Sequence, residues 1–172
     1  MSGTRIDKAG IRLDRKRTLT FRFNGRNYQG FAGDTLASAV LAAGDTVLSR
    51  SWKYHRPRGV LTCGVEEPAA LVQLESGDKT IPNAKMPEVE LYDGLRAESA
   101  LPWPNPAKHL LSINRWFTPL FPAGFYYKTF MWPAKAWMWY ERFIRKAGGL
   151  GAAPEQEDQD RYVHQNIHCD VL

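Results

Sequence analysis

An Asn-Gly pair at positions 24–25 constrains the fold of this chain more than any other local feature. It separates two segments, 18–23 and 26–31, in which apolar and polar residues alternate with the period of a β-strand. Asn and Gly tolerate the positive φ angles of a two-residue turn, so this pattern predicts a β-hairpin. In the resulting register Phe21 faces Tyr28, which predicts an aromatic pair on the buried face.

The residues after the hairpin predict a helix that crosses it. Asp34 is placed to cap the free N–H groups of the first turn, and apolar residues then recur at helical spacing over 36–43. Gly44 follows at the position where a left-handed C-terminal cap is favoured. A hairpin followed by a crossing helix is typical of the β-grasp, although many other α+β folds begin in the same way.

Further strand-like segments follow at 47–49, 69–74, 80–81 and 89–91. They are short, and residues typical of turns separate them. We therefore predict an α+β domain over 18–95 with about five short strands and one packing helix.

The regions that flank this domain differ from it in composition. Residues 1–17 carry six Lys or Arg and two Asp without a regular period, which predicts a basic, extended arm. In 96–160, two short helices are predicted, one after Pro106 and one after Pro133, and twelve of the chain's 21 aromatic residues lie within 116–143. Two short helices cannot bury so many rings against each other, so this aromatic-rich linking region is expected to contact another domain or subunit. The candidate interface residues are Phe125, Tyr126, Tyr127, Lys128, Phe130 and Trp132, together with Tyr54 and His55 of an earlier loop.

Composition limits the classes of function that are open to the chain. Cys63 and Cys169 are too few for a disulfide framework, which favours a reducing compartment. The sequence contains neither an apolar leader nor an apolar segment long enough to span a bilayer, so we expect a cytoplasmic protein without membrane contact. The net charge of +5 is unevenly spread, because acidic residues gather in 154–172. That arrangement opposes a continuous nucleic-acid track.

The stretch 51–72 concentrates the residues with functional chemistry. Lys53, Arg56 and Arg58 are interleaved with aromatic residues, and they are candidates for contact with a cofactor phosphate, with a partner carboxylate or with solvent alone. A plant-type [2Fe–2S] site needs four thiolates, three of them in one loop with C-x4-C-x2-C spacing. Only Cys63 is available in this loop, so we predict no metal site and expect Cys63 to be a small buried residue. No general base or oxyanion motif accompanies it, and no catalytic residue is assigned.

Five segments of the chain resemble the N-terminal part of the α subunits of heterotetrameric sarcosine oxidases and, more broadly, related amine- and imino-acid-oxidising complexes. They are GDTLASAVLAAG (33–44), SRSWKYHRPRGVLTCGVEEPAALV (49–72), PNAKMPEVELYDGL (82–95), AGFYYKTFMWP (123–133) and HCDVL (168–172). The resemblance implies a ferredoxin-like β-grasp domain in which Cys63 matches the first cluster-ligand position and the other cluster cysteines are lost. It also implies that 161–172 begin a dinucleotide-binding Rossmann domain that is truncated here.

The same resemblance implies a role outside catalysis. Complete complexes of this family bind NAD on the α subunit, FMN between α and β, and FAD on β, and they oxidise sarcosine to glycine, a formaldehyde equivalent and hydrogen peroxide. This chain would then be a non-catalytic structural and intersubunit module without a cofactor of its own. Its partners would be the remainder of the α subunit and the β, γ and δ subunits. The alternative is a free-standing [2Fe–2S] ferredoxin-like electron-transfer protein or a basic nucleic-acid-binding module.

Overall fold

The computed structural model describes residues 4–6, 9–51, 53–100, 106–108, 110–117, 119, 123–124, 132–166 and 168. The candidate interface residues of 125–130 lie outside the described residues, and so does most of HCDVL at 168–172. Within the described ranges, no helix is long and apolar enough to cross a membrane.

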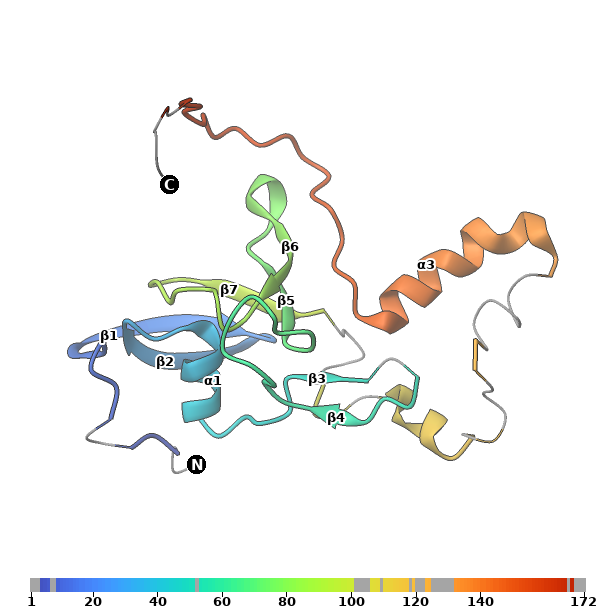
Figure 1. Ribbon diagram of the computed structural model, residues 1–172, viewed down its shortest axis with the longest axis horizontal. Helices are drawn as coiled ribbons and strands as arrows, with labels where there is room; N and C mark the ends of the chain where they lie inside the picture. The colour runs from blue at the N-terminus through green and yellow to red at the C-terminus, as the bar shows by residue number, and fades with distance from the viewer. Residues whose placement is uncertain are drawn as a thin grey trace.

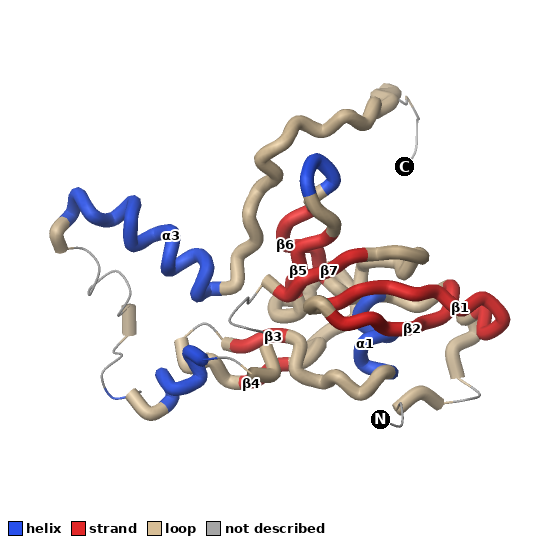
Figure 2. Tube along the Cα trace, turned by 180° about the vertical axis from the view of Figure 1, so that it is seen from behind, coloured by secondary structure: helices blue, strands red, loops and turns tan. Residues whose placement is uncertain are grey.

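A five-stranded sheet in the order β2-β1-β7-β5-β6 forms the centre of the fold. Strands β1 and β7 run parallel, and the other neighbouring pairs are antiparallel. Helix α1 crosses one face of this sheet, as Figures 1 and 2 show from opposite sides. The predicted α+β architecture is therefore confirmed. Along the chain the elements are β1 (Asp14–Phe23), β2 (Arg26–Ala32), α1 (Leu36–Ala42), β3 (Ser49–Arg50), β4 (Pro57–Arg58), β5 (Leu71–Leu74), η1 (Gly77–Lys79), β6 (Ile81–Lys85), β7 (Arg96–Ser99), η2 (Leu110–Arg115), η4 (Ala134–Ala136) and α3 (Trp137–Gly148).

Strands β1 and β2 form the predicted hairpin. Its turn residues Asn24 and Gly25 have φ angles of 48° and 77°, as a two-residue turn requires. Phe21 pairs with Tyr28, and their rings stack with centroids 5.5 Å apart, so the predicted register is confirmed. The predicted start of the first strand is wrong, because β1 begins at Asp14 rather than at position 18. Within this extension Asp14 pairs with Ala32 of β2, and the basic residues 15–17 lie in a register irregularity between Asp14 and Thr18.

Thr35, and not Asp34, caps helix α1. Its hydroxyl accepts a hydrogen bond from the N–H of Ser38 at 3.2 Å, and the hydroxyl oxygen of Ser38 accepts one from the N–H of Thr35 at 3.0 Å. This reciprocal pair is a capping box. The prediction for Gly44 is confirmed, because it follows the helix with a left-handed φ of 96°.

Asp34 instead fixes the N-terminal arm. Arg5 donates to both of its carboxylate oxygens, at 3.0 and 2.8 Å, and the Arg5 guanidinium lies over the ring of Phe31 at 5.1 Å. Burial raises the pKa of Asp34, but hydrogen bonds from Arg5, from the Phe31 N–H and from Ser38 outweigh that effect and lower it. The N–H of Thr4 also donates to the carbonyl of Ala42 at 3.1 Å. The described part of the arm is therefore docked on the helix and the sheet.

Helix α1 packs directly on the backbone of β2 at Gly30. A Cβ atom at this position would lie 2.5 Å from Cδ2 of Leu91 and 3.0 Å from Cβ of Ala39. Only glycine allows this close approach of helix and strand. The largest apolar side chains of the core around this contact come from the sheet, the helix and the loops between them; they are Leu19, Phe21, Phe23, Leu36, Val40, Leu48, Val72, Met86 and Leu95.

The sheet contains one strand that the sequence does not predict. Strand β7 lies between β1 and β5, although its sequence, Arg-Ala-Glu-Ser, is polar. Its side chains are alternately exposed and buried, so its pattern is that of a half-buried strand, but four residues are too short to show it. The strand predicted at 89–91 is instead a single bridge between Thr35 and Glu90.

Of the two helices predicted in the linking region, one is a 3-10 helix and the other is an α-helix. The first is the 3-10 helix η2 rather than an α-helix, and its apolar residues Leu110 and Ile113 are exposed. The second is the α-helix α3, which ends at Gly149 with a left-handed φ of 73°. Figure 1 shows α3 projecting away from the sheet, with its C-terminal end nearer to it.

The segment after α3 is docked on the sheet. Ala152 and the side-chain amide of Gln73 on β5 exchange two hydrogen bonds, each 2.9 Å long. The N–H of Gly151 donates to the side-chain oxygen of Asn83 on β6 at 2.8 Å. This segment therefore attaches the end of α3 to the β5–β6 edge.

The contact at Gly30 generates a stability prediction. Gly30→Ala places a methyl group against Leu91 and Ala39, and we expect it to lower the free energy of unfolding by about 1–3 kcal/mol. Gln29→Ala is the matched control, because Gln29 is exposed on the same strand, and it should change the stability by less than about 0.5 kcal/mol. Urea denaturation of the two variants measures both values. Equal stability of the two variants would contradict the close packing.

Candidate functional site

The loop between β4 and β5 folds around the carboxylate of Glu67. This side chain is 1% exposed. One carboxylate oxygen accepts the N–H groups of Leu61 and Thr62 at 2.7 and 2.8 Å, and the other accepts those of Ala69 and Ala70 at 2.7 and 3.0 Å. A single side chain therefore satisfies four backbone donors, which come from both arms of the loop.

The environment of Glu67 favours its ionised form. Burial raises the pKa of a carboxyl group, but the hydrogen bonds from the backbone of Thr62, Ala70, Ala69 and Leu61 lower the pKa of Glu67 below its ordinary value. Backbone N–H groups that converge in this way form an anion-binding concavity. In this protein the concavity is filled by a carboxylate of the same chain.

Cys63 does not belong to the interior of this loop. It is exposed, so the expectation of a small buried residue is wrong. The preceding residue faces inward instead, and the Oγ1 atom of Thr62 is buried without a hydrogen-bond partner among the described residues. The N–H of Thr62 donates to the carboxylate of Glu67, whereas the next side chain, that of Cys63, lies at the surface.

Strand β6 supports the loop from its other side. The ammonium group of Lys85 donates to the carbonyl of Val65, and the N–H of Met86 donates to the carbonyl of Ala70 at 2.9 Å. The position of the loop is therefore set by Lys85 at the end of β6 and by Met86, the next residue, as well as by the carboxylate of Glu67.

The basic residues before this loop lie on a ribbon formed by β3 and β4. Arg50 fixes the connection between these two strands, because its Nη1 donates to the carbonyl of His55 at 2.7 Å. Its Nε and Nη2 reach the carbonyls of Pro106 and Ala107 at 2.5 and 3.2 Å and tie the ribbon to the linking region. The sequence did not single out Arg50, since its partners are carbonyls that no residue pattern reveals.

The structure separates the three basic candidates for cofactor contact. Lys53 and Arg56 both lie over the ring of Tyr54, each with its charged group 5.0 Å from the ring centroid. Arg58 is exposed and lines a different feature, a cleft of about 160 Å³ between the β3–β4 ribbon, the Glu67 loop and Gly148-Gly149. They therefore do not converge on one site.

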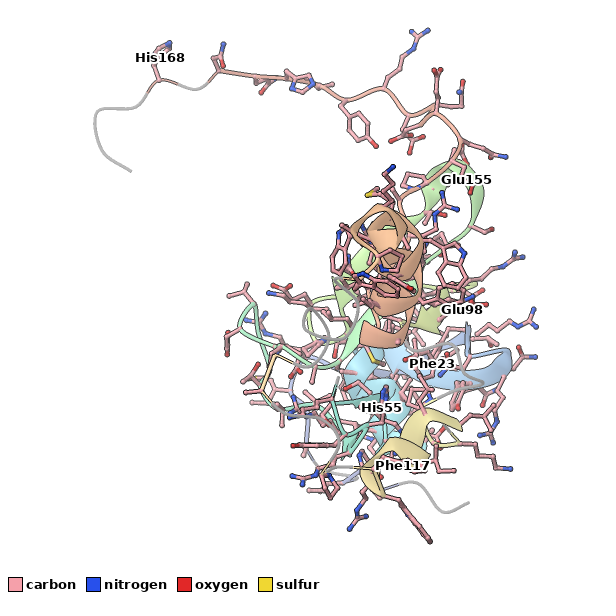
Figure 3. All side chains as sticks on the ribbon, turned by 90° about the vertical axis from the view of Figure 1, so that its right-hand side faces the viewer. Phe23, His55, Glu98, Phe117, Glu155 and His168 are labelled. Atoms are coloured by element: carbon pink, nitrogen blue, oxygen red, sulfur yellow. The ribbon has the colours of Figure 1, made fainter. Side chains whose placement is uncertain are left out.

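The candidate interface residues also divide. Tyr54 stands between Lys53 and Arg56, whereas His55 is 3% exposed and so cannot be part of an exposed contact surface (Figure 3). Trp132 is 84% exposed, just before η4 and α3. Met138, Trp139 and Phe143 of α3 are also exposed. Trp139 and Phe143 belong to the aromatic-rich region that the sequence predicts to contact another domain or subunit, but the candidate residues did not include these three.

The residues of this loop do not fit a [2Fe–2S] cluster. Such a cluster requires four thiolates, and the whole chain contains two cysteines, Cys63 and Cys169. Among the residues that the structure describes, no three His, Cys, Asp or Glu side chains come together to hold a metal ion. A buried carboxylate occupies the centre of the loop instead.

Comparison with known proteins shows two long matches. Sarcosine oxidase subunit alpha of Rhizobium meliloti (strain 1021) is 49% identical over 173 aligned residues, which cover 100% of this chain and 17% of that protein. Sarcosine oxidase subunit alpha of Corynebacterium sp. (strain U-96) is 39% identical and covers 95% of this chain and 12% of that protein. The chain thus spans less than a fifth of the length of either relative. A crystal structure of L-proline dehydrogenase from P. horikoshii covers 49% of this chain with a TM-score of 0.37 and 24% identity, which is too distant to carry an argument.

The lowered pKa of Glu67 predicts how stability depends on pH. A carboxyl group with a lower pKa in the folded than in the unfolded chain stabilises the fold above its unfolded pKa, which is about 4.5 for Glu67. This contribution is lost as the pH falls from there through the folded pKa. Glu67→Gln should therefore be less stable than the wild type at pH 7, and the difference should shrink below about pH 4.5. Glu66→Gln, at the exposed neighbouring position, serves as the control in thermal denaturation across this range. A constant difference for Glu67→Gln at every pH would contradict the prediction.

A family model described as the 2Fe-2S iron-sulfur cluster binding domain matches residues 16–101, which is half of the chain. The match includes the hairpin, α1, the Glu67 loop and β7. With the relatives above, it confirms the resemblance to sarcosine oxidase α subunits, and the chain belongs to the 2Fe-2S iron-sulfur cluster binding domain family.

Proposed function

We propose that this chain is a structural and intersubunit module of the α subunit of a sarcosine oxidase-like complex. In this proposal it carries no iron–sulfur cluster and contributes no catalytic group. The observation that carries the proposal is the donor set of the cluster loop: its single cysteine, Cys63, is exposed, while the carboxylate of Glu67 occupies the interior. Similarity to sarcosine oxidase subunit alpha along the full chain supports the assignment to that complex.

Helix α3 is the best candidate for the intersubunit contact. Trp139 packs edge-to-face against Tyr140 and Phe143, with ring centroids 5.4 and 4.8 Å apart, yet Trp139 and Phe143 are 60% and 53% exposed. Preordered aromatic side chains of this kind are typical of the buried centre of an interface. The occupant that we propose is the remainder of the α subunit or another subunit of the complex.

The flavin and nicotinamide chemistry of such a complex would take place outside this module. FAD, FMN and NAD would be held by other parts of the assembly, which oxidises sarcosine in the cytoplasm. Arg58 remains a candidate for contact with a partner carboxylate or a cofactor phosphate, because it lines the cleft beside Gly148-Gly149. Lys53 and Arg56 would contact the partner through the basic and aromatic surface that they form with Tyr54.

Iron analysis tests the absence of a cluster. The 172-residue chain, expressed with iron supplementation and purified without oxygen, is expected to contain far less than one iron atom per chain and no iron–sulfur absorbance. Two cysteines cannot supply the four thiolates. Two iron atoms and two acid-labile sulfides per chain would instead support the electron-transfer alternative and overturn the proposal.

Coexpression with the other parts of a sarcosine oxidase-like complex tests the interface. The double variant Trp139→Ser, Phe143→Ser should reduce recovery of the chain with its partners by about tenfold or more, as the loss of buried aromatic contacts does. Arg142→Ser, on the same helix, is the matched control and should assemble as the wild type does. The double variant should keep the melting temperature of the free chain, because α3 has no buried residue. Unchanged recovery of the double variant would exclude this face of α3 as the contact.

A further inference from the structure

The N–H groups of 61–62 and 69–70 form a cradle around Glu67 that resembles the backbone of a cluster-binding loop. Iron–sulfur clusters are anionic, and their loops supply converging backbone N–H groups as well as thiolates. Here four N–H groups from 61–62 and 69–70 converge within 2.7–3.0 Å of the two oxygens of one carboxylate. The chain therefore supplies the anion at the point where the N–H groups meet.

The spacing of cluster ligands in related loops shows which ligand position Glu67 would occupy. We call a set of three positions with this spacing a ligand frame. The plant-type spacing C-x4-C-x2-C can be placed on the loop in two ways, starting from Cys63 or from the residue before it. The frame that starts at Cys63 continues to Pro68 and Leu71, and its first two positions are exposed. In this frame, two of the three ligand positions therefore lie at the surface and not in the interior of the loop.

The frame that starts one residue earlier consists of Thr62, Glu67 and Ala70. Glu67 and Ala70 are buried, and the hydroxyl of Thr62 is buried as well. The N–H groups of Thr62 and Ala70, the outer positions of this frame, both donate to the side chain at its central position. The three positions are therefore buried at least in part, and the backbone at both outer positions contacts the side chain at the central one.

We propose that the carboxylate of Glu67 is an internal replacement for the iron–sulfur cluster, and that the ligand frame of this loop is Thr62, Glu67 and Ala70 and not the frame of Cys63. This rests on the proposed absence of a cluster. It assigns to Glu67 the role of the anion that closes the loop, and it corrects the expected correspondence between Cys63 and the first cluster ligand. A second consequence is that the cradle, once emptied of its side chain, is a binding site for a small carboxylate.

Chemical rescue of Glu67→Ala tests the replacement. The variant leaves four converging N–H groups without their acceptor, so its melting temperature should fall, and acetate or formate should restore at least half of the loss. Sodium chloride at equal ionic strength should restore much less, because chloride is a single atom and cannot accept hydrogen bonds at the two separate positions that the carboxylate oxygens occupy. Wild type and Glu66→Ala are the controls, and neither should respond selectively to acetate. If Glu67→Ala is unfolded in chloride, acetate should induce folding, measured by circular dichroism. Equal effects of acetate and chloride on Glu67→Ala would overturn the proposal.

Thiol reactivity tests the ligand frame. In the double variant Thr62→Cys, Cys63→Ser, the new thiol should react with an aromatic disulfide reagent at least about tenfold more slowly than Cys63 does in the wild type, because it faces the interior. Peptide mapping of the modified protein separates either thiol from Cys169. Equal rates would overturn the frame. Neither experiment depends on the sarcosine oxidase assembly, so a failed assembly or a positive iron analysis is distinguishable from failure of this inference.

Discussion

The close contact between α1 and β2 is the constraint on which the rest of the fold depends. Because Gly30 has no side chain, Ala39 of the helix approaches the backbone of the strand, and Leu91 covers the same point from the outside. This approach brings Leu36 and Val40 onto the sheet, where they meet Phe21. Close packing of this kind stabilises through many dispersion contacts and the exclusion of water, and it requires no bound group.

Two buried carboxylates complete this core at its edges. Asp34 joins the N-terminal arm, the end of β2 and the first turn of α1 through Arg5, the N–H of Phe31 and Ser38. Glu67 joins both arms of the loop before β5. Each carboxylate accepts charge-assisted hydrogen bonds that offset the cost of burying it, and removal of either would leave buried donors without partners.

The proposed role of Glu67 accounts for a loop that belongs to an iron–sulfur family but contains a single cysteine. A cluster performs two physical tasks in such a loop: it supplies the anion for converging N–H groups and it cross-links the chain. In the proposed replacement, the carboxylate of Glu67 performs the first task, and contacts of Lys85 and Met86 with the loop take over the second. The exposed aromatic residues of α3 lie later in the linking region than Ala107, where Arg50 attaches that region to the β3–β4 ribbon.

The sequence alone determined the features that depend on neighbours a few residues apart. The hairpin, its Phe21–Tyr28 register and the left-handed Gly44 follow from φ preferences and side-chain alternation, which act locally. The α+β class and the family resemblance were also recoverable, since they rest on the order of such elements and on sequence similarity along the chain.

Only the tertiary structure decided the features that depend on distant partners. Strand β7 is polar and four residues long, and it becomes a strand because β1 and β5 offer hydrogen-bonding edges on both sides. The exposure of Cys63 and the burial of His55 depend on how their loops turn, which residue types do not encode. For Glu67, the sequence showed only an acidic residue a few positions after Cys63. Its role required the folded loop, because four backbone N–H groups converge on one carboxylate only after β4, β5 and β6 have placed both arms of the loop.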